Sequence, residues 1–156
     1  MEKSSLILLF LALTFFACEK ANLNAGEASL EGTWNVNSIF SAYGERTELG
    51  INVKESIQEE GNLGAFNFSE TTVDASYTRL DTLYEIASSW ELKRDKISEG
   101  FSKVEQYTLC TDDQSFICEF GDQTKDAERN ATQIRLIFET TEIGAYEQFV
   151  LKLEKE

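Results

Sequence analysis

Apolar and polar residues alternate along most of the chain after Leu30. A period of two is typical of an antiparallel strand with one buried face, whereas a parallel strand, buried on both faces, is apolar throughout. The alternating runs lie at residues 34–40, 66–69, 73–78, 84–93, 107–109, 116–120, 134–139 and 149–154. The pattern therefore predicts an antiparallel, all-β domain.

Short polar segments separate these runs. Glycine, asparagine, aspartate or serine marks a break at residues 61–62, 95–96, 98–100, 112–114 and 143–144. Many short strands joined by tight turns are typical of a closed barrel or a sandwich. The stretch Thr47–Glu60 fits either a strand or a short helix, and the stretch Gly121–Asn130 indicates a loop. We expect one domain with one core over residues 30–156.

The chain begins with an apolar run, Leu6–Ala17, that is shorter than the roughly 20 residues a membrane-spanning helix needs. A short run that ends in a small residue is typical of an export signal. The segment Leu13–Cys18 resembles the lipobox of bacterial lipoproteins, which implies a signal peptide at 1–17 and a diacylglyceryl group on Cys18. It also implies a lipid-anchored protein of the bacterial cell envelope, at the periplasmic or surface face of the outer membrane. Residues 18–29 are polar and small, so we expect a flexible tether that reaches about 18 Å.

The domain opens with Leu30–Val36, whose sequence is Leu-Glu-Gly-Thr-Trp-Asn-Val. This opening resembles the Gly-x-Trp signature on the first strand of the lipocalin-like domains of small bacterial lipoproteins. The resemblance implies an eight-stranded antiparallel up-and-down barrel, in which Gly32 lets the chain enter and Trp34 plugs the closed end. It also implies an arginine from a late strand over the indole, and Arg135 is the candidate for that position.

Composition narrows the range of functions. The chain holds 28 acidic and 14 basic residues, a formal net charge of −14, and no histidine. Nucleic-acid binding needs a basic surface, and histidine is the commonest general base and transition-metal ligand. The sequence also lacks a Gly-x-Ser-x-Gly elbow, a glycine-rich phosphate loop and a metal-ligand cluster. We therefore expect a protein that is not an enzyme, binds no nucleic acid and uses no metal or cofactor.

The excess of acidic residues allows two interpretations. It keeps the surface soluble and opposes self-association, or it favours cationic ligands. Four acidic residues lie close together in the sequence and indicate either a solvated loop or a weak cation site: Asp112, Asp113, Asp122 and Asp126. We favour the solvated loop, because no Asp-x-Asp-x-Asp-Gly loop is present.

Cys110 and Cys118 are placed symmetrically about Gln114. A hairpin centred on that residue would set the two cysteines opposite each other, close enough for a disulfide. If Cys18 carries a lipid, the other two also form an even pair in an oxidising compartment. We therefore predict a structural disulfide, with three unpaired thiols as the alternative. A redox role is not expected, because neighbouring carboxylates raise the pKa of a thiol.

A set of residues on the inward parity combines aromatic rings with hydroxyl groups: Tyr77, Tyr84, Ser88, Trp90 and Tyr107. An eight-stranded barrel is wide enough to hold one small ligand or to be filled by its own side chains, and ligand pockets are mostly apolar with a few polar groups. The leading hypothesis is a lipid-anchored barrel that binds a small apolar or amphipathic molecule. The alternative is a filled barrel that contacts an envelope protein through its segments at 44–61 and 121–130.

Overall fold

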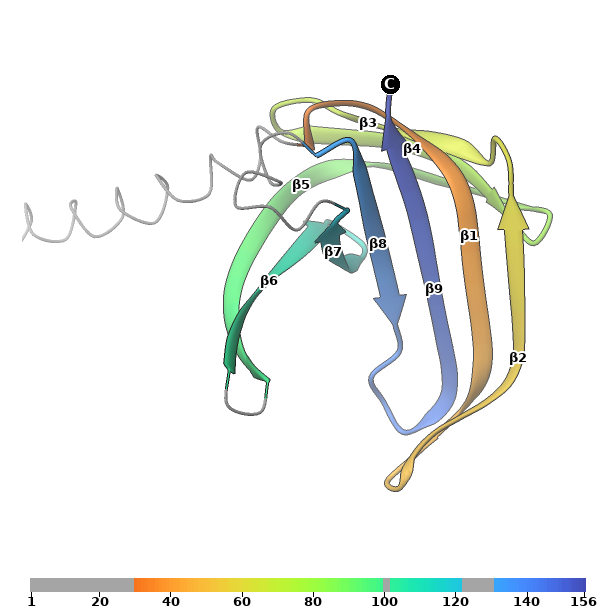
Figure 1. The fold of residues 1–156 in the computed structure, drawn as a ribbon. Coiled ribbons are helices and arrows are strands. Elements are labelled where there is room, and N and C mark those ends of the chain that lie inside the picture. Colours follow the sequence, from red (N-terminus) through yellow and green to blue (C-terminus); the bar gives the residue numbers. More distant parts are fainter. Residues whose placement is uncertain (1–29, 100–101, 122–130) are drawn as a thin grey trace, which may run out of the picture.

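The computed structural model describes residues 30–99, 102–121 and 131–156. The predicted signal peptide (1–17), the tether (18–29) with Cys18, and the acidic residues Asp122 and Asp126 lie outside this part of the chain. Within it, no helix is long and apolar enough to cross a membrane. Its elements are nine β-strands (Figure 1): β1 (Gly32–Thr47), β2 (Gly50–Glu60), β3 (Gly64–Phe68), β4 (Thr72–Arg79), β5 (Thr82–Glu99), β6 (Ser102–Thr111), β7 (Ser115–Phe120), β8 (Gln133–Glu139) and β9 (Gly144–Lys155).

The strands form one antiparallel sheet that closes on itself. Each strand from β3 to β9 pairs with the next, and β1 pairs with both β3 and β9. These eight strands make a closed barrel, and β2 is one extra strand beside β1. The predicted all-β, antiparallel, eight-stranded barrel is confirmed, and the arrangement is consistent with a lipocalin-like fold.

The stretch that fitted either a strand or a helix is strand β2. It pairs with the second half of β1, on the same edge that β3 uses for the first half. The link between β2 and β3 stays on that edge, because the Gly61 and Leu63 amides donate to the Asn37 and Val36 carbonyls, each at 3.0 Å. In the described part of the chain β2 pairs with β1 alone, so its outer edge carries no neighbouring strand.

A shift of register in β1 explains why Ile39 is buried although it does not share the parity of Trp34 and Val36. Trp34 and Val36 are fully buried inside the barrel, and after a shift between Val36 and Ser38 the buried positions become Ile39 and Ser41. The extra residue keeps apolar side chains inside on both halves of the strand. One long strand can therefore follow the curvature of the barrel.

Strand β5 is longer than the turn signals indicated. It continues through Asp95 and Lys96 to Glu99, so the predicted break at 95–96 is wrong. The register places Lys96 opposite Glu105 on β6, and the Glu105 carboxylate pairs with Arg94 of β5 at 2.6 Å, so opposite charges stabilise this part of the sheet.

The core fills the barrel from the end where β1 begins. Its largest fully buried side chains are Trp34, Phe66 and Phe116. Figure 1 shows β8, β9, β1 and β2 running side by side, with the β1–β2 and β8–β9 turns at the same end. We call this the far end, because it lies opposite Trp34.

Candidate functional site

The resemblance implies that Trp34 plugs the closed end, and the structure places this residue inside the barrel near the start of β1. Its side chain is fully buried, and its indole Nε1 donates to the carbonyl of Leu30 at 2.6 Å. The Nζ atom of Lys155, from the last strand, lies 5.3 Å from the centre of the ring. Gly32 enters β1 with a φ of 115°, a conformation that suits glycine.

The expectation that Arg135 covers the indole is wrong. Arg135 alternates on β8 with the buried Ile134 and Leu136, so its side chain lies on the outer face of the barrel, where it pairs with Glu119. Lys155 supplies the cation instead. The resemblance implied an arginine from a late strand, and the structure has a lysine from the last strand.

The predicted disulfide between Cys110 and Cys118 is also wrong. Both cysteines are unbonded, with Cys118 buried and Cys110 half-buried. The β6–β7 turn is centred between residues 112 and 113, because Cys110 pairs with Ser115 and Cys118 pairs with Tyr107. The two cysteines consequently lie on opposite faces of the sheet. Burial, with a smaller contribution from Glu119, raises the pKa of Cys118 to about 12.

Three of the five predicted ligand residues belong to a continuous row of aromatic rings inside the barrel. The ring centres of Tyr77 and Tyr84 are 5.4 Å apart, and Tyr77 stacks on Phe66 at 5.7 Å. Phe66 contacts Phe68, which meets Trp90 edge to face at 5.3 Å. The indole of Trp90 donates to the Ser69 carbonyl at 3.0 Å, so this ring is fixed in place.

The other two predicted residues do not join this row. Tyr107 is buried opposite Cys118 and meets Phe120 edge to face at 5.2 Å. Ser88 is half-buried, and its hydroxyl donates to the Ser89 carbonyl at 2.9 Å. The five residues therefore share the inner face without converging on one point.

The sequence analysis missed Arg79, a buried charge inside the barrel. Only 7% of its surface is exposed. Its guanidinium carbon lies 4.2 Å from the ring centre of Phe149 and 4.9 Å from that of Tyr84, so two aromatic rings lie against it. Its Nη2 donates to the Tyr84 hydroxyl at 3.1 Å and pairs with Glu147 at 2.9 Å. The alternation of β4 holds the missing signal, since Arg79 continues the inward parity of Val73, Ala75 and Tyr77.

Arg79 and the groups around it shift one another's pKa values. Burial would lower the pKa of Arg79, but its hydrogen bond to Tyr84 and the negative charge of Glu147 raise that pKa above its usual value. Burial raises the pKa of Tyr77 to about 12, although Arg79 opposes the shift. Arg79 is therefore charged and Tyr77 protonated at neutral pH.

The far end of the barrel is less tightly closed than the end at Trp34. Toward this end, Tyr84 and Phe138 pack against the core but are only half-buried. The β1–β2 and β8–β9 turns expose Leu49 and Ile143, which are 101% and 68% accessible. Apolar surface therefore lies both on the inner wall and on the turns of this end.

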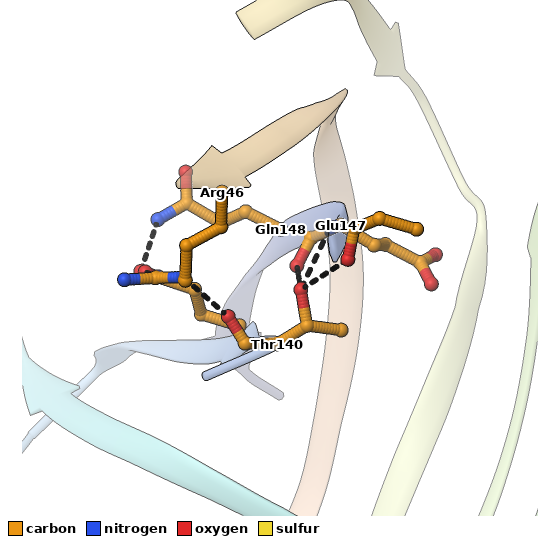
Figure 2. A network of polar contacts seen from close by, with 6 residues as sticks. Arg46, Thr140, Glu147 and Gln148 are labelled. Atoms are coloured by element: carbon orange, nitrogen blue, oxygen red, sulfur yellow. Dashed lines mark hydrogen bonds and ion pairs between the residues drawn. The ribbon is translucent and has the colours of Figure 1, made fainter. Parts of the chain in front are cut away.

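A network of polar contacts braces the β8–β9 turn against β1 (Figure 2). Arg46 pairs with Glu139, and its Nε donates to the Thr140 carbonyl at 3.1 Å. The Glu147 amide donates to the Thr140 hydroxyl at 2.9 Å. Gln148 donates to the Glu139 carboxylate at 3.1 Å. The backbone of Glu147 is thereby held, while its carboxylate is directed away from the network and pairs with Arg79.

Of the four acidic residues singled out in the sequence, the structure describes Asp112 and Asp113, and Asp112 takes part in hydrogen bonds between strands. Asp112 accepts hydrogen bonds from the Ser89 hydroxyl at 2.7 Å and from the Ser89 amide at 3.1 Å. These residues, with Trp90 and Cys110, line a shallow hollow of about 250 Å³ between β5 and β6. Among the residues that the structure describes, no three carboxylate or thiol side chains are grouped so that they could hold a metal ion.

Comparison with protein-family models, with curated proteins and with solved structures finds no match to this chain. The structure is a closed eight-stranded antiparallel β-barrel, consistent with a lipocalin-like fold, with Trp34 fully buried at one end. The other end carries half-buried aromatic rings and one buried arginine.

Proposed function

We propose that the barrel binds one small amphipathic molecule at its far end. The observation that carries the proposal is the inner wall there, where half-buried aromatic rings stand next to a buried guanidinium. Small-molecule sites combine mostly apolar walls with a few placed polar groups. The closed end, filled around Trp34, supplies a rigid support for that wall.

The proposal includes a lipid anchor on Cys18 and a place in the bacterial cell envelope, with no catalytic role. The short apolar run before Cys18 and the polar segment that follows it support the anchor. Labelling of growing bacteria with an alkyne-tagged fatty acid tests it. Incorporation into the protein is expected, and the variant Cys18→Ser should incorporate none.

Displacement of a neutral fluorescent probe tests ligand binding. N-phenyl-1-naphthylamine gains fluorescence when it enters an apolar site, and single-chain lipids should displace it. The variant Tyr84→Ser removes a ring from the inner wall and should weaken probe binding. The matched control is Phe40→Ser, because Phe40 is also a half-buried ring but lies on the opposite face of its strand from Ile39. Equal loss of binding in both variants, or no binding by the wild-type protein, contradicts the proposal.

A second candidate is a protein-interaction module. One observation favours it: the β1–β2 segment exposes Leu49, Ile51 and Val53, which are 101%, 43% and 50% accessible. Apolar side chains beside a strand edge without a neighbour suit strand addition by a partner. Crosslinking in membranes separates the two functions, because a triple serine variant of this segment should lose a protein partner and keep probe binding.

A further inference from the structure

We infer that the ligand carries a carboxylate head group and that Arg79 binds this carboxylate directly. The inference rests on the proposed function, since it names the chemical class of the molecule that the barrel would hold. It derives from the hydrogen bonds that the buried guanidinium does not make.

Arg79 is a buried cation whose donors are only partly used. Its Nη2 contacts Tyr84 and Glu147, whereas its Nε and Nη1 are buried and have no hydrogen-bond partner among the described residues. A buried donor without an acceptor costs free energy, and more so when the donor belongs to a charged group. Two donors of the buried guanidinium therefore lack an acceptor among the described residues.

The aromatic rings beside Arg79 restrict the directions from which an acceptor can approach its guanidinium. Phe149 and Tyr84 lie against the guanidinium at 4.2 and 4.9 Å, so they hold its plane and leave its edge for hydrogen bonds. The two free donors, Nε and Nη1, lie on opposite sides of the guanidinium, so each offers a single charge-assisted hydrogen bond to a carboxylate oxygen. The Tyr84 hydroxyl already accepts a bond from Arg79, so its own proton can be donated to a ligand oxygen.

Glu147 contacts Arg79 through a single guanidinium nitrogen. About a third of its side chain remains exposed, so water shares in solvating its charge. Its backbone is held by Thr140, which fixes where the carboxylate can reach. A ligand carboxylate would then compete with Glu147 for the charge of Arg79 without having to displace it.

Access to Arg79 runs past Tyr84. The ring of Tyr84 is half-buried at the start of β5, in the stretch Thr82–Ser89 that pairs with β4. The pairing of β5 with β6 begins only at Trp90. Rotation of this ring would uncover the guanidinium toward the far end, where the half-buried rings of Tyr84 and Phe138 would meet the apolar part of the ligand.

The test compares three lipids of equal chain length: a fatty acid, its methyl ester and the corresponding alcohol, each displacing N-phenyl-1-naphthylamine from the full-length protein. We expect the acid to bind roughly ten- to a hundredfold more tightly than the ester and the alcohol. The variant Arg79→Gln should remove this advantage. The variant Glu147→Gln should enlarge it, because the competing carboxylate is gone.

Arg135→Gln is the control for loss of one positive charge, since Arg135 lies on the outer face. It should leave the advantage of the acid unchanged. If Arg79→Gln does not fold, Glu147→Gln still tests the inference, and an unchanged preference in that variant overturns it. Equal binding of acid and ester to the wild-type protein overturns the inference alone. Failure of the probe and of all three lipids to bind overturns the proposed function as well.

Discussion

The buried thiol of Cys118 makes the stability of the barrel depend on pH in the alkaline range. Burial raises the pKa of this thiol from 9.0 to about 12 in the folded chain. A raised folded pKa contributes its full stabilisation below the unfolded pKa, and that contribution is lost as the pH rises toward the folded pKa. Each pH unit between the two values costs about 1.4 kcal/mol. Raising the pH from 8 to 10 should therefore lower the free energy of unfolding by about 1.4 kcal/mol through Cys118 alone.

Urea unfolding at pH 8, 9 and 10 measures this loss. The variant Cys118→Ala loses packing equally at every pH, so its stability should fall less steeply than that of the wild-type protein. The matched control is Cys110→Ala, which removes a half-buried thiol from the other face of the sheet. Tyr77, whose pKa burial raises to about 12, titrates alike in all three proteins and cancels from the comparison.

Two results would refute this reasoning. If the wild-type protein and Cys118→Ala lose the same stability between pH 8 and 10, the thiol of Cys118 is not held protonated inside the barrel. If Cys110→Ala shows the same shallower dependence, the loss of stability is not specific to the buried thiol of Cys118.

Two further predictions concern the closed end and the packing of β3. Lys155→Met should cost about 0.5–1 kcal/mol and shift the emission of Trp34, because a cation leaves the indole; Arg135→Met should leave that emission unchanged in a fluorescence spectrum. Gly64→Ala should cost about 3 kcal/mol or more in urea unfolding, because its new Cβ would lie 2.1 Å from the Ser76 carbonyl oxygen. Gly50→Ala has a similar φ but open space, so a cost of about 1–2 kcal/mol, from backbone strain alone, is expected there; equal costs would show that crowding at Gly64 is unimportant.

The strands could be predicted from the sequence because alternation is a local pattern, whereas the role of Trp34 at the closed end was implied by a family resemblance. Alternation of apolar and polar residues needs only the neighbours in the chain, and it placed Trp34 and Tyr77 inside the barrel correctly. The proposed site at the far end depends on Arg79, a charged residue at an inward position. The alternation of β4 assigns Arg79 to the inner face, but the packing of Phe149 and Glu147 that stabilises a charge there comes from a distant strand and leaves no local pattern.

The sequence pattern did not predict the register between β6 and β7. The cysteine spacing suggested a turn centred on Gln114, but the Thr111 amide donates to the Gln114 carbonyl at 2.8 Å and closes the turn earlier. The Thr111 hydroxyl reinforces that closure from its side chain. The centre of the turn moves by one and a half residues, which puts Cys110 and Cys118 on opposite faces. The turn closed by Thr111 and Gln114 is therefore incompatible with the predicted disulfide.

In the described part of the chain, one edge of β2 has no neighbouring strand, so aggregation of the protein in acid depends on its net charge. An unprotected strand edge is a template on which another copy can add a strand, and charged side chains oppose such growth. Strand β2 carries Glu55, Glu59 and Glu60, and the whole chain reaches zero net charge near pH 4.4. Around that pH the repulsion between copies is lost while the apolar Ile51 and Val53 stay exposed. Storage of the purified protein well above that pH should therefore suppress edge-to-edge aggregation.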